Sequence, residues 1–318
     1  MKPTIKINFI DFWPGFLKEK NFLISILSKQ FQVVLSDEPD ILFYSCYGSE
    51  YLKHKGVRVF YSPENIRPDF AACDYAMTFD FLDSPRHFRL PLYAFYIDQR
   101  NSWKDILEKK EQKEIQLAWE KKSKFCCMVV SNGQSKKRID FFKLLSQYWQ
   151  VDSGGRYMNN VGGAVADKMA FIRDYKFVIA FENSSYSGYT TEKLLDPMLV
   201  DSIPVYWGNE RVGLDFNPRR FLNLHDFSSE EKLIQEMMAI EKDSARAIQM
   251  LCEPIFPGNE LPECIQEKNI MRFLISIVDS LNTVVPVATT SKRFLHDIKR
   301  KGKIVGFYVN KIICKNFR

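Results

Sequence analysis

Residues able to bind a phosphate group follow a short apolar segment near the middle of the chain. The apolar, β-rich run at residues 177–181 predicts a strand buried on both faces. A polar loop follows it, and Thr190 or Thr191 can cap a helix whose first turn carries Glu192 and Lys193. Free amides at a helix start attract anions, and the lysine adds a full charge beside them. We therefore expect a diphosphate to bind here, with Glu192 accepting hydrogen bonds from ribose hydroxyls.

The same spacing also fits an ordinary capped helix with a solvated Glu-Lys pair, because T-x-E-K strings often occur by chance. Pro197 lies inside this helix, where it removes a backbone hydrogen bond and is expected to cause a kink. Since the kink falls after the first turn, we expect it to alter packing rather than contacts with phosphate.

Glu64 is a candidate general base. It follows the predicted strand at residues 57–62 across Pro63, which favours an extended or turn conformation. Its side chain would then stand at the C-terminal edge of a sheet, where substrate crevices open. A carboxylate at that edge can accept the proton of an attacking hydroxyl. A surface glutamate in a turn is the alternative reading of the same residues.

The pattern of apolar runs predicts two α/β domains, since the chain of 318 residues is about twice the length of a typical domain. The first domain spans residues 1–122 and ends in the charged segment 103–124, which we expect to be a surface helix and crossover. The second spans residues 123–290. We expect strands at 5–9, 31–35, 41–45, 57–62 and 125–130, helices at 16–29 and 136–149, and a helix opened by Ser228 with Glu231 in a capping box.

The cysteines and the apolar segments indicate the kind of compartment. Seven cysteines are scattered without C-x-x-C spacing, which disfavours a zinc site and is typical of buried thiols in a reducing compartment. No signal peptide is evident, and no window reaches the ~18 apolar residues needed to span a bilayer. We therefore expect a cytoplasmic protein.

Residues 291–318 form a basic tail, with nine Lys or Arg against one Asp. Its apolar residues recur at helical spacing and most of its cations fall off that stripe, which favours an amphipathic helix on an anionic membrane surface. Gly302 and Gly306 weaken such a helix, and the stripe could instead pack on the first domain. No basic patch with interleaved aromatics occurs elsewhere, so nucleic acid is not expected as a partner.

Several strings together resemble a known family. The sequence FENS, a short loop, Y-x-T-E-K and then I-P-V-Y-W-G is similar to the donor-site signature of the α-1,3/4-fucosyltransferases, glycosyltransferase family ten. Further similar strings occur in the family's order, namely 8-NFIDFWPGF-16, 59-VFYSPENIRPDF-70, 73-CDYAMTFD-80, 89-RLPLY-93 and 215-DFNPRRFLNLHDF-227. The resemblance implies the GT-B architecture, two Rossmann-like domains facing a central cleft.

The resemblance also implies a donor and roles for particular residues. It places the GDP-fucose site on Asn183, Tyr189, Glu192 and Lys193, with Lys193 on the diphosphate. A basic residue is expected in the glycine-rich stretch 152-DSGGRYMNNVGG-163, where Arg156 is the available arginine. Glu64 would be the catalytic base.

The implied reaction is inverting transfer of L-fucose from GDP-β-L-fucose to O3 or O4 of N-acetylglucosamine or glucose in a surface glycan, giving a Lewis-type product. The chain contains no D-x-D string, so we expect catalysis without a metal or other cofactor. The absence of the N-terminal anchor of animal and plant members points to a bacterial enzyme, peripheral on the inner face of the cytoplasmic membrane and acting in glycan or lipopolysaccharide synthesis. The alternatives are a related GT-B enzyme using another nucleotide sugar, or a non-catalytic, membrane-associated module that binds glycan or nucleotide.

Overall fold

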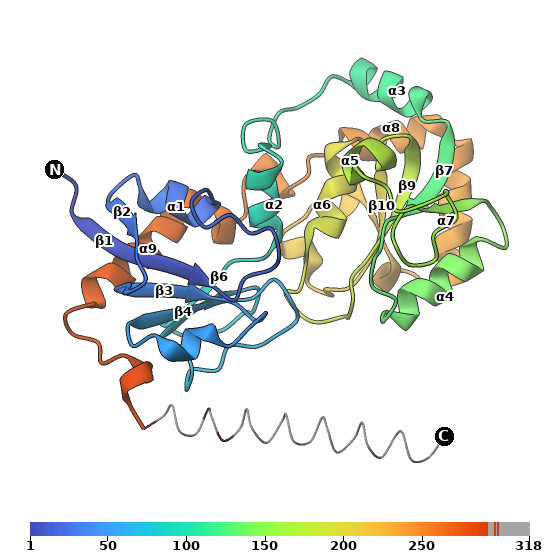
Figure 1. Cartoon of the computed structure of the whole chain (residues 1–318). Helices are drawn as coiled ribbons and strands as arrows, with labels where there is room; N and C mark the ends of the chain where they lie inside the picture. Colours follow the sequence, from blue (N-terminus) through green and yellow to red (C-terminus); the bar gives the residue numbers. More distant parts are fainter. Residues whose placement is uncertain (292–295, 297, 299–318) are drawn as a thin grey trace, which may run out of the picture. The chain divides into compact units, whose positions relative to one another are not determined.

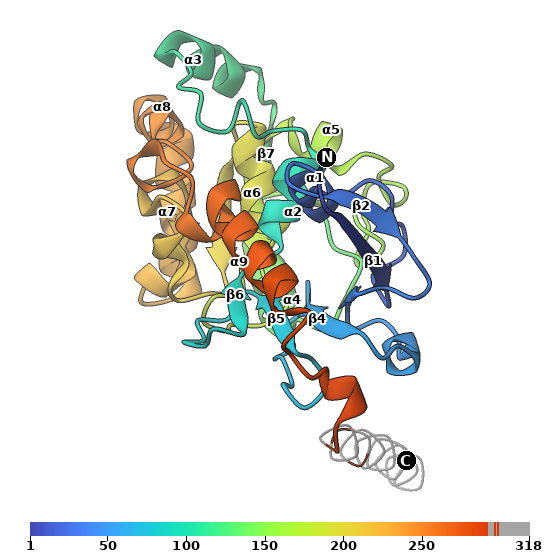
Figure 2. The ribbon, with the colours of Figure 1, turned by 90° about the vertical axis from the view of Figure 1, so that its left-hand side faces the viewer.

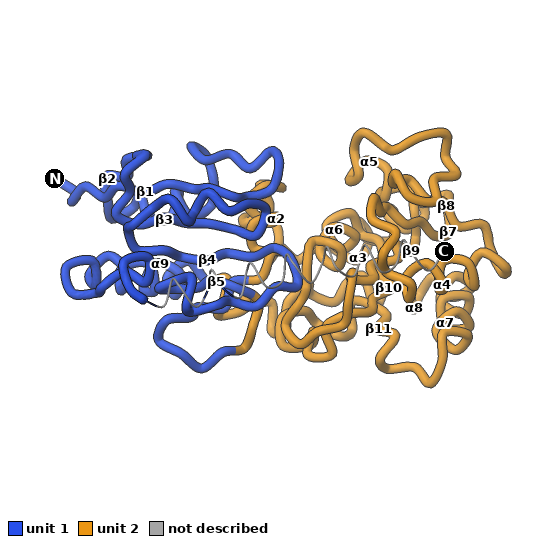
Figure 3. The backbone as a smooth tube through the Cα atoms, turned by 60° about the horizontal axis from the view of Figure 1, so that its bottom comes forward, with its two compact units in different colours: residues 1–78, 82–90, 266–318 blue, residues 79–81, 91–265 orange. Residues whose placement is uncertain are grey.

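The computed structural model describes residues 1–291 together with His296 and Ile298, and it divides the chain into two compact units. Unit 1 contains Met1–Thr78, Leu82–Leu90 and the chain from Gln266 onward, whereas unit 2 contains Phe79–Phe81 and Pro91–Ile265 (Figure 3). Each unit is built around its own parallel sheet. No helix in the described part of the chain is long and apolar enough to cross a bilayer.

This division differs from the predicted one, which placed a single boundary near residue 122 and assigned residues 123–290 to the second domain. The chain enters unit 2 at Pro91 and returns to unit 1 at Gln266. The return has a physical cause, because the apolar face of α9 (Glu267–Ser280) packs on unit 1, with Phe273 against the rings of Tyr75 and Phe88. The predicted tail lies outside the described residues, apart from Ser291, His296 and Ile298.

Unit 1 has a six-stranded parallel sheet in the order β2-β1-β3-β4-β5-β6 (Figure 1). The four predicted strands of this unit are confirmed. The predicted helix at 16–29 is shortened because Asn21 caps its start, accepting from the amides of Leu23 and Ile24. The elements are β1 Thr4–Ile10, α1 Phe22–Leu27, β2 Gln32–Leu35, β3 Ile41–Tyr44, β4 Val57–Tyr61, β5 Tyr75–Thr78, β6 His87–Arg89 and α9 Glu267–Ser280.

Unit 2 has a five-stranded parallel sheet in the order β11-β10-β9-β7-β8. The predicted strand at 125–130 and helix at 136–149 are confirmed, and the charged segment 103–124 is helical over its second half only. Ser229 rather than Ser228 caps its helix, because the Ser229 hydroxyl accepts from the Lys232 amide. The elements are α2 Tyr93–Gln99, α3 Gln112–Lys121, β7 Lys124–Met128, α4 Lys136–Leu145, β8 Val151–Ser153, α5 Lys168–Ile172, β9 Tyr175–Phe181, α6 Glu192–Leu199, β10 Ile203–Trp207, β11 Leu222–Asn223, α7 Glu230–Lys242 and α8 Ser244–Cys252.

The two faces of β9 pack against different helices. Phe177, Ile179 and Phe181 belong to the large core cluster that also contains side chains of α3, α4, α7 and α8, and the last two helices lie side by side (Figure 2). Val178 faces the other way, toward Ile172 of α5 and Val200 beyond α6. Side chains alternate along a strand, so the residue after Phe181 points to the α6 side.

Each sheet has one point where the connections leave in opposite directions. In unit 1 the chain goes from β1 to β2 on one side and then to β3 on the other side of β1. In unit 2 it goes from β7 to β8 and then to β9 on the other side of β7. Ligands of open parallel sheets bind beyond the C-terminal ends of the strands at such switch points. The loops after β1, β3, β7 and β9 are therefore the places to look for function.

Candidate functional site

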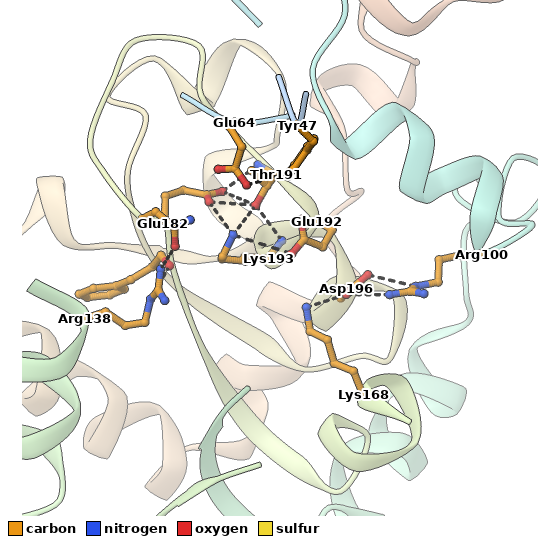
Figure 4. Close-up of polar contacts among 12 residues, drawn as sticks. Tyr47, Glu64, Arg100, Arg138, Lys168, Glu182, Thr191, Glu192, Lys193 and Asp196 are labelled. Atoms are coloured by element: carbon orange, nitrogen blue, oxygen red, sulfur yellow. Dashed lines mark hydrogen bonds and ion pairs between the residues drawn. The ribbon is translucent and has the colours of Figure 1, made fainter. Parts of the chain in front are cut away.

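A buried carboxylate lies directly after β9, at the switch point of unit 2. Glu182 is 0% exposed, and its oxygens accept from the Thr191 amide at 2.7 Å and from the Lys193 ammonium at 3.1 Å (Figure 4). The Thr191 hydroxyl bonds the same carboxylate at 2.8 and 2.9 Å. All of these partners donate hydrogen bonds, and an ionised carboxylate only accepts them, so this set of partners suits the ionised form of Glu182.

The cluster fixes the charge of Lys193. Burial lowers the pKa of this ammonium, but the carboxylates of Glu182 and Glu192 outweigh burial and raise its pKa above the ordinary value. Burial raises the pKa of Glu182, although Lys193 opposes it. Burial raises the pKa of Glu192, but the positive charges of Lys193 and Lys168 outweigh burial and hold this pKa below its usual range. Lys193 is therefore a permanent cation in the first turn of α6.

Local sequence explains this geometry. Thr191 is the N-cap of α6, with extended backbone and a side chain that accepts from the Lys193 amide, so of the two predicted threonines it is Thr191 that caps. Strand alternation turns Glu182 toward α6 rather than toward α4. The sequence reasoning did not assign Glu182, yet its position one residue beyond a strand buried on both faces was a usable signal.

The C-terminal end of α6 is held by two buried cations. Lys122 donates to the Val200 carbonyl at 2.9 Å, and Arg220 donates to the Met198 carbonyl at 3.4 Å. Burial lowers the pKa of Lys122 to about 8. Pro197 lies inside the helix as predicted, and α6 ends two residues later at Leu199. These cations satisfy carbonyls that the helix end leaves without an intrahelical partner.

Asn183 is held by a residue that the sequence reasoning missed. Arg138, in the first turn of α4, is 1% exposed and donates to the Phe181 carbonyl at 3.0 Å and to Asn183 Oδ1 at 2.6 Å. Burial lowers the pKa of this guanidinium, although Glu182 opposes it. Because α4 follows β7 and Asn183 follows β9, the two loops at the switch point are joined here. The signal in the sequence that could have identified Arg138 is an arginine in the first turn of the helix that follows β7.

The loop between Asn183 and Thr191 rests on Asn209, which follows β10 and is fully buried. Its side chain accepts from the Gly188 amide at 2.7 Å and donates to Thr190 at 3.0 Å. Gly188 has φ +88, and a Cβ there would lie 2.4 Å from the Phe79 carbonyl, so only glycine fits.

Tyr189 packs inside the loop rather than facing solvent. It is 2% exposed and its ring lies 5.0 Å from that of Phe79. Glu192 and Lys193 lie 3.8 Å apart at the start of α6, and Asn183 begins the loop that leads to it, whereas Tyr189 packs on Phe79.

Arg156 does not join this group. It is exposed in the loop after β8, and it forms no hydrogen bond or ion pair with the part of the chain that the structure describes. The arginine that contacts the predicted donor residues is Arg138, which lies on the helix after β7.

A second carboxylate on α6 ties three helices together. The Asp196 side chain is 0% exposed. Its carboxylate forms ion pairs with the Arg100 guanidinium at 3.0 Å and with the Lys168 ammonium at 2.7 Å (Figure 4). Arg100 ends α2 and Lys168 begins α5. Since breaking a buried ion pair costs about 3–5 kcal/mol, this pairing fixes the helix that carries Lys193.

Glu64 lies in unit 1, on the loop after β4. Tyr47, on the loop after β3, donates its hydroxyl to Glu64 Oε1 at 3.1 Å (Figure 4). The Ser62 hydroxyl accepts from the Glu64 amide at 3.2 Å and donates to the Glu64 carbonyl at 2.9 Å. The carboxylate is partly exposed and oriented, as a base acting on a bound hydroxyl requires.

The described residues hold no group of three or more His, Cys, Asp or Glu side chains placed to bind a metal ion, and the six cysteines among them are free thiols. Two parallel-sheet α/β units are characteristic of the GT-B class of glycosyltransferases, and the structure has this architecture. The family can be named more closely from two family models. An α-(1,3)-fucosyltransferase FucT N-terminal domain matches residues 7–96, and glycosyltransferase family 10 (fucosyltransferase) matches residues 119–250. The chain belongs to glycosyltransferase family 10.

Known relatives and solved structures agree with this assignment. The α-(1,3)-fucosyltransferase FucT of Helicobacter pylori is 32% identical over 79% of this chain and 60% of its own length. A mouse 4-galactosyl-N-acetylglucosaminide 3-α-L-fucosyltransferase is 31% identical over 39% of this chain and 35% of its own. A solved α1,3-fucosyltransferase with GDP-fucose is similar over 90% of this chain and 93% of its own, with a TM-score of 0.75 and 27% identity. The chain thus spans about 60% of the Helicobacter relative and less of the mouse one.

Proposed function

We propose that this protein transfers L-fucose from GDP-β-L-fucose, with inversion, to O3 or O4 of N-acetylglucosamine or glucose in a surface glycan, forming a Lewis-type product. The observation that carries the proposal is the Lys193 ammonium, held by Glu182 in the first turn of α6 at the switch point of unit 2. The names of two mammalian relatives support both the sugar and the acceptor class, because they are a bovine 4-α- and a mouse 3-α-L-fucosyltransferase of galactosyl-N-acetylglucosaminides.

The chemistry is a single displacement at C1 of fucose. Glu64 takes the proton of the acceptor hydroxyl, the hydroxyl oxygen forms the new bond to C1, and the bond from C1 to the β-phosphate oxygen breaks. The electron pair of that bond leaves on GDP. Lys193 and the positive end of the α6 dipole stabilise the charge that develops on the diphosphate. Arg138 fixes Asn183 beside them and adds a second positive charge.

The donor and the linkage are tested directly with the purified chain and N-acetyllactosamine as acceptor. We expect transfer from GDP-fucose and none from GDP-mannose or UDP-sugars, with an α-fucoside on the glucosamine unit in the NMR spectrum of the product. Turnover is expected to persist in EDTA, because the protein's own cations serve the diphosphate. Transfer from another donor would favour a related enzyme, and binding without turnover a silent module. Loss of activity in EDTA with recovery on adding manganese would contradict metal independence.

We also propose that residues 291–318 bind an anionic membrane surface and keep the protein at the inner face of a bacterial cytoplasmic membrane. Their charge of nine cations against one Asp supports this. Removing residues 299–318 is expected to abolish co-sedimentation with phosphatidylglycerol vesicles and leave transfer to soluble acceptor unchanged. Equal sedimentation of both forms, or aggregation of the shortened one, would show that the tail serves the fold instead.

A further inference from the structure

An aromatic cluster closes the C-terminal end of the unit 1 sheet. It begins on the sheet itself, where the buried rings of Phe9 and Phe43 stack at 5.0 Å. It continues into the loop after β1, where Phe12 stacks on Phe16 at 4.1 Å. Phe9 and Phe43 are core, whereas Phe12, Trp13 and Phe16 on the loop are each partly exposed, and Pro14 and Gly15 are exposed. Trp13 is the one indole among these partly exposed rings of the loop.

Two sets of contacts connect the loop of Trp13 with the loops that carry and hold the proposed base. Its ring is 6.2 Å from that of Tyr61, the last residue of β4, and Glu64 follows three residues later. The Tyr47 amide donates to the Asp11 carbonyl at 3.0 Å, while the Tyr47 hydroxyl holds Glu64. The loops after β1, β3 and β4 thus meet at one edge, and the first two flank the switch point of this sheet.

The loop that carries Trp13 is held in one conformation. Asp11 has φ 58, which is unfavourable for a residue with a side chain. Its carboxylate accepts from the Glu50 amide at 3.2 Å and from the Tyr51 amide at 2.9 Å. A Cβ on Gly48 would lie 2.0 Å from Asp11 Oδ1, so a larger residue there would displace the carboxylate from these two amides. Such over-determined strain is typical of binding sites.

We propose that Trp13 is the platform on which a sugar ring of the acceptor stacks, and that it places the attacking hydroxyl at Glu64. Galactose and glucosamine rings each have a face that carries mainly C–H bonds, and an indole binds such a face while leaving the hydroxyls to polar partners. Tyr47 is 45% exposed and extends the same surface to the carboxylate. The inference rests on the proposed function and names the acceptor subsite within it.

The test separates acceptor binding from donor chemistry. Trp13→Ala is expected to raise the KM for N-acetyllactosamine about 10- to 100-fold, as the loss of one aromatic contact predicts. Hydrolysis of GDP-fucose by water and the Kd of GDP-fucose should stay unchanged. Trp149→Ala is the matched control, since Trp149 is a 37% exposed tryptophan of unit 2 that stacks on Phe125; its acceptor KM should not move.

A direct binding measurement covers the case in which the alanine variant folds poorly. N-acetyllactosamine should change the tryptophan emission of the unaltered protein, and this change should disappear in Trp13→Phe while transfer persists. An unchanged acceptor KM in Trp13→Ala, or an unchanged emission response in Trp13→Phe, would overturn the inference about Trp13. The proposed function would not be affected by either result. If the unaltered protein neither hydrolyses nor transfers from GDP-fucose, the proposed function fails and the inference with it.

Discussion

Replacing Glu64 by glutamine is expected to abolish fucose transfer while GDP-fucose still binds. The amide has the shape of the carboxylate and can still accept from Tyr47, so the loop after β4 should keep its conformation. It cannot take a proton, and loss of a general base lowers kcat by about 10²- to 10⁴-fold. The residues assigned to the donor lie in unit 2, so the Kd of GDP-fucose should not change. Steady-state transfer and isothermal titration with GDP-fucose measure the two quantities.

Glu50→Gln is the matched control, because Glu50 is an exposed glutamate of unit 1 whose carboxylate forms an ion pair with Lys53. Its transfer rate should equal that of the unaltered protein. Tyr47→Phe removes the hydrogen bond to Glu64 and should lower kcat less than Glu64→Gln does. Normal turnover by Glu64→Gln would exclude this residue as the base.

Replacing Lys193 by alanine is expected to weaken GDP-fucose binding about 10- to 100-fold, because a charge-assisted bond to the diphosphate is lost. The change also leaves Glu182 buried without its cation, which costs about 3–5 kcal/mol of the free energy of unfolding. The two effects must be separated, since a destabilised site would bind poorly for a different reason. Thermal unfolding and titration with GDP-fucose are the measurements.

The double variant Glu182→Gln/Lys193→Met separates them. It removes both charges of the buried pair, so the midpoint of unfolding should recover toward that of the unaltered protein while donor binding stays weak. Lys176→Met is the control cation, since Lys176 pairs with Glu241 at 2.8 Å elsewhere in unit 2. Recovery of tight GDP-fucose binding in the double variant would show that Lys193 serves the fold and not the diphosphate.

Local patterns predicted the sheets well. The runs that became β1, β3, β4, β7 and β9 are short, apolar and bounded by polar turns, so length and composition sufficed. The assignment of elements to units could not be predicted in the same way. The return of α9 to unit 1 depends on Phe273 meeting Tyr75 and Phe88, residues about two hundred positions earlier, and periodicity does not reveal its partner.

Contacts within one element could be predicted from the sequence, and contacts that join two elements could not. Thr191, Glu192 and Lys193 occupy a single helix start, so capping and dipole arguments located them. Arg138 reaches Asn183 from the helix after β7, a contact that exists only because β7 and β9 are neighbours in the sheet. Arg156 looked suitable because it adjoins glycines, but its loop follows the edge strand β8. Strand order decided between the two arginines.

The discontinuous path of unit 1 limits how this protein can be divided into fragments. A fragment that stops at residue 90 would lack the helix whose Phe273 covers Tyr75 and Phe88, and whose Glu267 pairs with Lys29 at 2.6 Å. It would therefore expose an apolar sheet face to water and tend to aggregate. Chimaeras that exchange unit 1 between relatives need to move the first 90 residues together with the segment from Gln266, as two coordinated crossovers in the gene.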